Sequence, residues 1–281
     1  MTDFQAFPAP AKLNLFLHVV GRRADGYHLL QTAFRLISAA DTIHIAVTDD
    51  GHITLETPIP GVPAEADLTV RAARLLQQAT GSHQGCRLRI DKRLPMGGGL
   101  GGGSSDAATV LMALNHLWGC GQTQRQLQAL GLQLGADVPF FIFGRDAFAE
   151  GVGEQLQSLT VPPAWYVVLT PPVQVPTVEI FSDAGLTRNT PPIIMAAFPT
   201  SQLRNDLEPV AKRKYPEVEQ HLNWLSRFGS AMMTGSGACV FAAFGTQAEA
   251  EAVLQQLPPS MQGFVASSLM QHPLLDLFDR L

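Results

Sequence analysis

The chain has 281 residues, of which 46% are hydrophobic and 15% are charged. These values exclude a disordered chain and indicate a globular protein of about two domains. The net charge is −5, and no run of Lys and Arg is longer than residues 212–214. We therefore expect no nucleic-acid partner.

The three cysteines, Cys86, Cys120 and Cys239, are widely spaced. This spacing is typical of neither a disulfide framework nor a zinc site, and it favours a reducing compartment. The first residues lack the apolar core of a signal peptide, and no apolar stretch reaches the ~18 residues of a membrane-spanning helix. We expect a cytoplasmic protein without a membrane partner.

Residues 11–20 alternate in polarity and predict a strand. One face of this strand carries Leu13, Leu15, Leu17 and Val19. The other face carries Lys12, Asn14, Phe16 and His18. Lys12 is therefore either an exposed edge lysine or a fixed cation that neutralises charge on a reacting group.

Residues 21–28 predict a loop that contains a D-G turn. Tyr27 and His28 in this loop are either surface residues or a platform for a nucleobase, with the imidazole reading the polar edge of the base. Residues 41–47 and 52–56 predict a hairpin, and residues 67–80 predict a helix.

The stretch PMGGGLGGGSSDAA, residues 95–108, follows a predicted strand at 86–94 and precedes a predicted helix at 104–118. The apolar face of that helix carries Ala107, Val110, Leu111, Leu114, Leu117 and Trp118. We expect Ser104, Ser105 and Asp106 to cap the start of the helix. A bare glycine loop that leads into a helix N-terminus suits a phosphate group.

The glycine stretch has three other possible interpretations. A flexible linker is disfavoured because a strand and an amphipathic helix flank the stretch. A Walker A loop is excluded because no Gly-Lys-Ser/Thr follows. A dinucleotide fingerprint fits the spacing only loosely, and no acidic residue follows about 20 positions later.

Asp137 lies between a predicted helix at 123–134 and an apolar run that ends at residue 144. It is either a helix cap or a carboxylate that faces a cleft. At its ordinary pKa of ~3.9 the carboxylate is ionised at neutral pH. It is then able to accept a hydroxyl proton during phosphoryl transfer, which depends more on positioning than on a strong base.

The second half contains a buried strand at 165–172, and we expect a domain boundary near 150–165. Further helices are predicted near 177–184, near 206–228 and at 246–257, and further strands at 239–245 and 263–269. Residues 233–238 form a second glycine turn, which is either a tight hairpin turn or a second loop around a nucleotide. The mixed order of strands and helices predicts an α+β fold.

The glycine stretch at 95–108 resembles the central motif of the GHMP kinases, a family of small-molecule kinases. Five further segments are similar to one branch of that family: PAKLNLFLHVVGRRADGYHLLQT (10–32), LGADVPFF (134–141), AFAEGVGE (147–154), RNDLE (204–208) and MTGSGACVF (233–241). The resemblance covers nearly the whole chain. It implies a ribosomal protein S5 domain 2-like N-terminal domain over residues 1–160 and a ferredoxin-like C-terminal domain over residues 161–281, with the site between them.

The resemblance also implies an activity. In this branch ATP phosphorylates the 2-hydroxyl of a cytidyl-diphospho-methylerythritol, a step in non-mevalonate isoprenoid biosynthesis. ATP and Mg²⁺ are the implied cofactors, and the partner is a small molecule. The oligomeric state is not implied.

Site residues follow from the matching motifs. Lys12 and Asp137 are the implied catalytic pair. The implied ATP-binding residues are Pro95, Met96, Gly97, Gly98, Gly99, Leu100, Gly101, Gly102, Gly103, Ser104, Ser105 and Asp67. The implied substrate-binding residues are Asn14, Tyr27, His28, Phe34, Val152 and Phe181, with the cytosine between Tyr27 and Phe181. The hydroxyls of Ser104 and Ser105 are the implied Mg²⁺ ligands.

One position departs from the family pattern. Asp67 stands where members of this branch often have an asparagine, and an ionised aspartate accepts hydrogen bonds but cannot donate them. We expect the nucleotide preference to differ in consequence. Two alternatives remain: another GHMP kinase of the homoserine or mevalonate type, and a nucleotide-binding regulator without catalysis.

Overall fold

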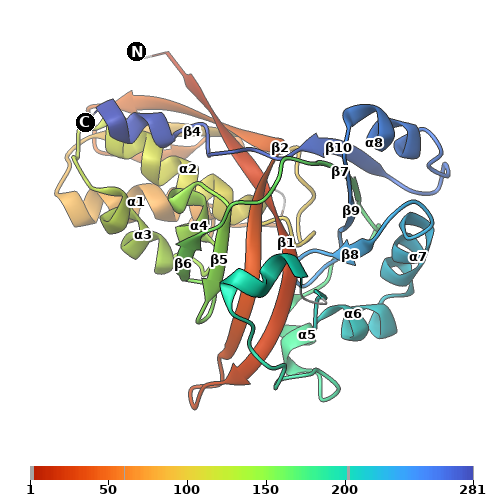
Figure 1. Cartoon of the computed structure of the whole chain (residues 1–281). Helices are drawn as coiled ribbons and strands as arrows, with labels where there is room; N and C mark the ends of the chain where they lie inside the picture. The colour runs from red at the N-terminus through yellow and green to blue at the C-terminus, as the bar shows by residue number, and fades with distance from the viewer. Residues whose placement is uncertain (1–2, 60, 201–202, 281) are drawn as a thin grey trace.

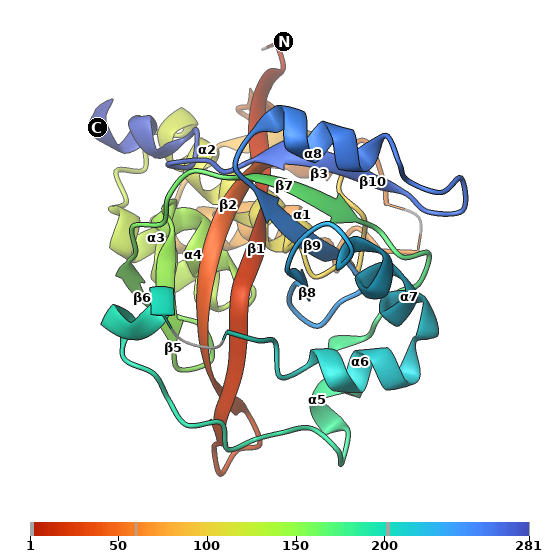
Figure 2. The ribbon, with the colours of Figure 1, turned by 45° about the vertical axis from the view of Figure 1, so that its right-hand side comes forward.

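A computed structural model describes residues 3–59, 61–200 and 203–280. Its first two strands, β1 (Gln5–Arg22) and β2 (His28–Thr48), form one long antiparallel hairpin. The register shifts at three places along the pair, and such irregularities bend and twist a ladder. Figures 1 and 2 show this hairpin running through the middle of the molecule.

The first sheet has the order β3-β4-β2-β5-β6, and β1 pairs with β2. The remaining strands are β3 (Ile53–Leu55), β4 (Gly85–Asp91), β5 (Ala147–Glu150) and β6 (Gln155–Ser158). The expected hairpin of residues 41–47 with 52–56 is wrong, because β4 lies between them. β4 pairs antiparallel with β2 and parallel with β3.

Four helices pack beside the first sheet (Figure 1). They are α1 (Leu68–Thr80), α2 (Gly102–Leu117), α3 (Gln124–Leu132) and α4 (Val138–Phe143). α2 contacts α1, α4, β1 and β2, and its buried residues belong to the largest core cluster. The central place of α2 fixes its N-terminus relative to β1.

The second sheet is antiparallel with the order β10-β7-β9-β8. Its strands are β7 (Trp165–Leu169), β8 (Ala231–Met233), β9 (Val240–Phe244) and β10 (Gly263–Ser267). The helices of this half are α5 (Thr177–Ser182), α6 (Glu208–Lys214), α7 (Pro216–Leu225) and α8 (Gln247–Leu254). Short 3₁₀ segments occupy Met195–Thr200 and Leu275–Arg280.

The second half has the βαββαβ order of a ferredoxin-like unit, which confirms the α+β fold that was expected. The single helix predicted near 206–228 is wrong. Pro216 begins a separate helix, because proline lacks the N–H that would continue α6.

The two sheets meet along β1 and β2. Leu13 of β1 packs in one cluster with Tyr166 and Val168 of β7, and Leu269 N donates to Leu36 O at 2.9 Å. The chain passes from one sheet to the other between Ser158 and Trp165. A domain boundary at residue 160 stays a prediction. The outer ends of the two predicted domains, residues 1–2 and 281, lie outside the described residues.

Candidate active site

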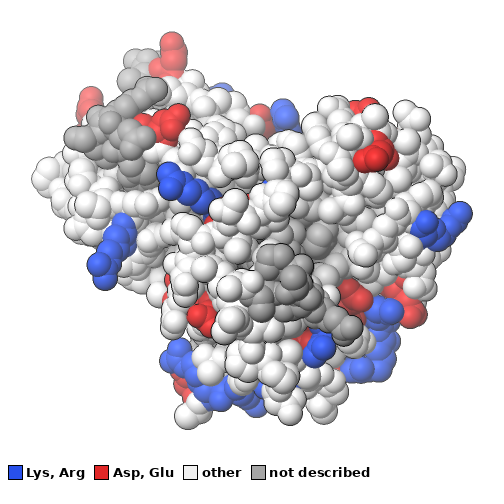
Figure 3. All heavy atoms as spheres, viewed as in Figure 1, with Lys and Arg blue, Asp and Glu red and all other residues white. Residues whose placement is uncertain are grey.

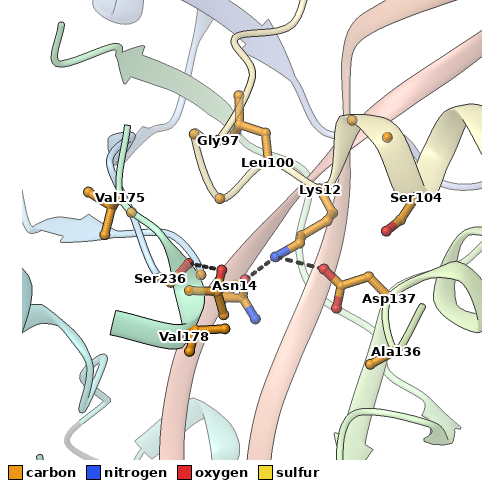
Figure 4. A pocket seen from close by; sticks show the side chains of 18 of the residues that line it. Lys12, Asn14, Gly97, Leu100, Ser104, Ala136, Asp137, Val175, Val178 and Ser236 are labelled. Atoms are coloured by element: carbon orange, nitrogen blue, oxygen red, sulfur yellow. Dashed lines mark hydrogen bonds and ion pairs between the residues drawn. The ribbon is translucent and has the colours of Figure 1, made fainter. Parts of the chain in front are cut away.

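A cavity of about 1090 Å³ opens between the two halves, and both halves line it. Its walls come from β1, the 95–103 glycine loop, the starts of α1 and α2, α5 and the turn at 235–237. Figure 4 shows Lys12 and Asp137 on one side of this space and Val175, Val178 and Ser236 on the other. This volume lies at the upper end of the ~300–1,000 Å³ range of ordinary ligand pockets, as a site for one large ligand or two adjacent smaller ones requires.

The glycine loop approaches its neighbours so closely that side chains do not fit. A Cβ atom on Gly99 would lie 2.2 Å from the Thr234 carbonyl oxygen, and one on Gly101 would lie 2.9 Å from the Phe141 ring. Both glycines have positive φ, +75° and +73°. The backbone at these two positions therefore requires glycine. The loop is also held against β1, because the backbone N–H of Lys12 donates to Leu100 O at 3.0 Å.

The helix after the loop begins at Gly102, with Gly101 as a left-handed N-cap that offers no side chain. The expected capping by Ser104, Ser105 and Asp106 is therefore wrong, because all three lie within the first turns. The amides of the first turn have no partners within the helix, so they face the loop as donors. This is the local structure that suits phosphate oxygens.

The two serines of the motif face different ways. Ser104 lines the cavity, whereas Ser105 is fully buried and its hydroxyl donates to Pro10 O at 2.7 Å. The structure therefore does not bring Ser105 to the cavity, and its expected roles toward ATP and Mg²⁺ stay predictions that this position does not support. The hydroxyl ties α2 to β1 instead.

The second glycine turn connects β8 and β9 as a hairpin. It also packs on the first glycine loop, because Cys239 N donates to Gly98 O at 3.1 Å and Thr234 Oγ1 donates to Gly99 O at 3.3 Å. The interpretation as a hairpin turn is confirmed. Gly235, Ser236 and Gly237 also line the same cavity as the first loop, and a role around a nucleotide stays a prediction.

Lys12 is 3% exposed, so it is not an edge lysine. Its Nζ donates to Oδ1 of Asn14 and lies 3.5 Å from Oδ2 of Asp137 (Figure 4). The amide of Asn14 is oriented by a hydrogen bond from Nδ2 to Thr32 Oγ1 at 2.9 Å. The Phe34 ring lies beneath the ammonium group, with its centroid 5.4 Å away.

Asp137 occupies the N-cap position of α4, but its side chain makes no capping hydrogen bond. The side chain is 33% exposed and lines the cavity beside Lys12. The structure thus favours the second interpretation, a carboxylate that faces a cleft. A carboxylate held beside a fixed cation and open to a cavity is suited to accept a proton from a bound hydroxyl.

Asp67 is the N-cap of α1, and its Oδ1 accepts from the backbone N–H of Thr69 at 2.8 Å. This capping role needs only an acceptor, so an aspartate fills it as well as an asparagine. Asp67 also lines the cavity. The expected difference in nucleotide preference stays a prediction.

Lys92 forms a second charged group on the cavity wall, which sequence reasoning missed. Its Nζ donates to Asp41 Oδ2 and, at 2.9 Å, to Asp106 Oδ2. Burial raises the pKa of Asp106 to about 7, although the charge of Lys92 opposes the shift. Oδ1 of Asp106 has no hydrogen-bond partner among the described residues.

The aromatic residues expected around a base lie at the far end of the cavity, which is the end near the turn between β1 and β2. Tyr27 is 65% exposed, and the rings of His28 and Phe181 are in direct contact, with centroids 5.0 Å apart. Burial, together with the charges of Arg188 and Arg22, lowers the pKa of His28. Val152 and Phe34 line the same cavity.

The structure therefore brings to one cavity all the expected site residues except Ser105. Sequence reasoning missed Lys92, Arg188 and Thr234. Arg188 donates to His28, 160 positions away, and Lys92 donates to Asp41, 51 positions away, and no local pattern predicts such pairs. Thr234 lies in the second glycine turn, residues 233–238. Its position next to Gly235 and close to Gly237 was the signal that could have selected it.

A Mg²⁺ ion of the kind that the resemblance implies would need oxygen ligands near the phosphate groups. The Ser104 hydroxyl, on the first turn of α2 and facing the cavity, fits this need. Among the described residues no group of three or more His, Cys, Asp or Glu side chains is arranged to hold a metal. Phosphate oxygens and water would have to supply most of the ligands, as they commonly do for Mg²⁺.

On the face in Figure 3, Lys and Arg side chains form small separate groups among mostly uncharged residues. In the part of the chain that the structure describes, no helix has both the length and the apolar character to cross a membrane. The expectation of no nucleic-acid partner is untested.

Two family models and a curated relative match this chain. Residues 67–145 match the GHMP kinases N terminal domain, and residues 193–261 match the GHMP kinases C terminal domain. The 4-diphosphocytidyl-2-C-methyl-D-erythritol kinase of Thiobacillus denitrificans is 64% identical over 97% of this chain and 98% of its own length.

Two solved structures extend the comparison. A crystal structure of 4-(cytidine 5'-diphospho)-2C-methyl-D-erythritol kinase superposes with a TM-score of 0.82 and 35% identity, over 94% of this chain and 99% of the other. The homoserine kinase of Cytophaga hutchinsonii superposes with a TM-score of 0.70 at 15% identity, over 97% and 96%, and shares the fold. The chain belongs to the GHMP kinase family and, within it, to the 4-diphosphocytidyl-2-C-methyl-D-erythritol kinases.

Proposed function

We propose that this chain transfers the γ-phosphoryl group of ATP to the 2-hydroxyl of 4-(cytidine 5'-diphospho)-2-C-methyl-D-erythritol, a step in non-mevalonate isoprenoid biosynthesis. The observation that carries the proposal is the ion pair of Lys12 and Asp137, which faces the cavity beneath a glycine loop. Relatives of this name and 64% identity support the choice of substrate.

Asp137 serves as the proton acceptor in this proposal. Its carboxylate is open to the cavity and makes no capping hydrogen bond that would compete with a substrate hydroxyl. Lys12, held by Asn14, lies 3.5 Å from the carboxylate and adds positive charge beside the group in transfer. Phosphoryl transfer through a loose transition state gains mainly from such positioning and charge neutralisation.

The phosphates of ATP lie, in this proposal, against the glycine loop and the start of α2. The absence of side chains at Gly99 and Gly101 leaves backbone within reach of phosphate oxygens, and the helix N-terminus favours their negative charge. Mg²⁺, when bound with ATP, would neutralise charge on the phosphates, and Ser104 is the residue placed to contact it.

The cytosine end of the substrate fits the far end of the cavity. Tyr27 offers an exposed ring face, and His28 offers a polar ring edge next to Phe181. The expected position of the base between Tyr27 and Phe181 is part of the proposal. A homoserine or mevalonate kinase has no base to place there, which separates the first alternative from this one.

The direct test measures ADP release from the purified protein with ATP and Mg²⁺. The cytidyl substrate, homoserine, mevalonate and galactose are offered in parallel. Turnover of the cytidyl substrate alone supports the proposal. Turnover of another alcohol rejects the substrate and keeps the kinase, whereas no turnover with any of them favours the non-catalytic regulator.

A variant pair tests the base platform. Tyr27→Ala should raise the KM for the cytidyl substrate about tenfold to a hundredfold, since stacking on an aromatic ring contributes ~1–3 kcal/mol per base. Tyr27→Phe keeps the ring and should leave this KM nearly unchanged, and neither variant should alter the KM for ATP. Equal changes in both KM values would contradict a cytosine platform at Tyr27.

We also propose a cytoplasmic location for this reaction. Cys86, Cys120 and Cys239 are all free thiols, which suits a reducing compartment. Fractionation of cells that express the full chain tests the location directly.

A further inference from the structure

Arg188 lies next to the far end of the cavity, where the base is proposed to bind, but it does not line the cavity. Its Nε donates to Nε2 of His28 at 3.0 Å. Its Nη1 donates to Leu186 O, and its Nη2 donates to the carbonyl oxygens of Phe181 and Asp183 at 2.9 and 2.8 Å. One guanidinium therefore joins the tip of the β1–β2 hairpin to the end of α5.

The bond from Arg188 determines where His28 carries its proton. An arginine side chain has only donors and does not lose its proton, so Nε2 of His28 must present a lone pair. The neutral imidazole then carries its hydrogen on Nδ1. The lowered pKa of His28 agrees with the neutral form, since burial and two nearby arginines disfavour a third positive charge.

The free side of the His28 ring is left to the cavity. No described residue is hydrogen-bonded to Nδ1 of His28, and His28 lines the cavity while Arg188 does not. The contact with Phe181, with centroids 5.0 Å apart, leaves no room for a base between these two rings. His28 is thus placed to meet a ligand with the edge of its ring rather than with its face.

We infer that Arg188 is a positioning residue for base specificity: by accepting no hydrogen bond itself, it holds His28 as an Nδ1–H donor that selects cytosine over uracil. This role presupposes the proposed function, because a base is read only if a pyrimidine nucleotide occupies this end of the cavity. Arg188 touches no substrate and acts through His28.

The selection follows from the edges of the two bases. At N3 cytosine has an acceptor, whereas uracil has an N–H. An Nδ1–H of His28 forms a hydrogen bond with the first and opposes a second donor in the other. A site that leaves a polar group unpaired against the wrong ligand discriminates more strongly than one that loses only apolar contact. The opposite tautomer, with its lone pair on Nδ1, would favour uracil.

Two substitutions separate the tautomer from the other contacts of Arg188. Lysine and glutamine both lose most of the hydrogen bonds to the carbonyls at the end of α5. Lysine, like arginine, can only donate to Nε2 of His28, whereas the glutamine amide can also accept from it. Arg188→Lys should therefore keep the Nδ1–H tautomer, and Arg188→Gln should release it.

The first readout is the ratio of kcat/KM for the cytidyl substrate to kcat/KM for its uridyl counterpart. We expect this ratio to fall about tenfold to a hundredfold in Arg188→Gln, the range of an unpaired buried hydrogen-bonding group, and to stay near the original value in Arg188→Lys. An unchanged ratio in Arg188→Gln, or an equal fall in both variants, would overturn the role of Arg188.

The second readout is the ¹⁵N NMR spectrum of the His28 ring in the full chain without ligand. The original protein and Arg188→Lys should show the proton on Nδ1, and Arg188→Gln should show a shift toward Nε2. A proton on Nε2 in the original protein overturns the inference. No turnover of the cytidyl substrate by the original protein would reject the proposed function instead, and the spectrum would still decide the tautomer.

Discussion

Two lysine–aspartate groups line the same cavity, and they differ in what surrounds their carboxylates. Asp137, beside Lys12, is 33% exposed and has no other polar contact among the described residues. Asp41, beside Lys92, is fully buried, and its Oδ1 accepts from the backbone N–H groups of Arg93 and Leu94 at 2.6 and 2.8 Å. One carboxylate is therefore available to a ligand, and the other is saturated by the protein.

The difference shows that residue type alone does not assign a role. Lys12 is buried, but the Asp137 side chain is 33% exposed and its carboxylate is held by this lysine alone among the described residues, so the carboxylate is available for chemistry. A buried carboxylate with three donors holds a loop in place, and removal of one partner leaves the others unpaired. We therefore expect substitutions at Lys12–Asp137 to change turnover and substitutions at Lys92–Asp41 to change stability.

The largest effect is expected for Asp137→Asn. The amide has the same shape but cannot accept the hydroxyl proton, so kcat should fall about 10²–10⁴-fold, the usual range for a lost general base. Steady-state ADP release measures the change, and the KM values for both substrates should remain similar.

The free energy of unfolding of Asp137→Asn serves as the control for the loss of turnover. Urea unfolding should give a free energy within about 1 kcal/mol of the original, since the pair with Lys12 is partly exposed. Near-normal turnover in a folded variant would remove Asp137 from the proposed role. A large loss of stability would instead make Asp137 similar to Asp41, and the contrast between the two groups would fail.

Asp41→Ala should have the next largest effect. It leaves Lys92 with one carboxylate and leaves the N–H groups of Arg93 and Leu94 without their acceptor. We expect a loss of about 3 kcal/mol in the free energy of unfolding, measured by urea denaturation.

Asp41→Asn is the matched control, because its amide oxygen still accepts from the backbone N–H groups and only the negative charge is lost. It should lose less stability than Asp41→Ala. If the folded fraction of Asp41→Ala loses turnover as strongly as Asp137→Asn, the division between a catalytic and a structural group is wrong.

The group of Lys12 and Asp137 could be predicted from the sequence, whereas the group of Lys92 could not. Lys12, Asp137 and the glycine loop each lie in a short contiguous motif that resembles the family pattern, although the local pattern alone left the roles of Lys12 and Asp137 open. The contacts of Lys92 join residues 41, 92 and 106, which only the fold brings together. Asp106 was interpreted as a helix cap because the loop was expected to end two residues later than it does.

The errors in the fold have the same origin. The hairpin of 41–47 with 52–56 was expected because short connections favour antiparallel neighbours, but β4, more than 30 residues later, takes the position between them. The break in the helix near 206–228 was readable from Pro216. Distant pairing left no such local signal.

The smallest effect is expected for Asp106→Asn, and it concerns pH. Burial raises the pKa of Asp106 to about 7, well above its value in an unfolded chain. The folded state therefore binds a proton more tightly than the unfolded state between pH ~4 and ~7. The contribution of Asp106 to stability is full below pH ~4 and is lost as pH rises through about 7.

Asparagine removes this titration and still offers an oxygen to Lys92. The free energy of unfolding of Asp106→Asn, relative to the original protein, should consequently rise from pH 4 to pH 8, measured by urea denaturation at each pH. A difference that stays constant with pH would contradict the raised pKa of Asp106. It would mean that Lys92 offsets the burial of Asp106 in full, so that this carboxylate is ionised throughout the range.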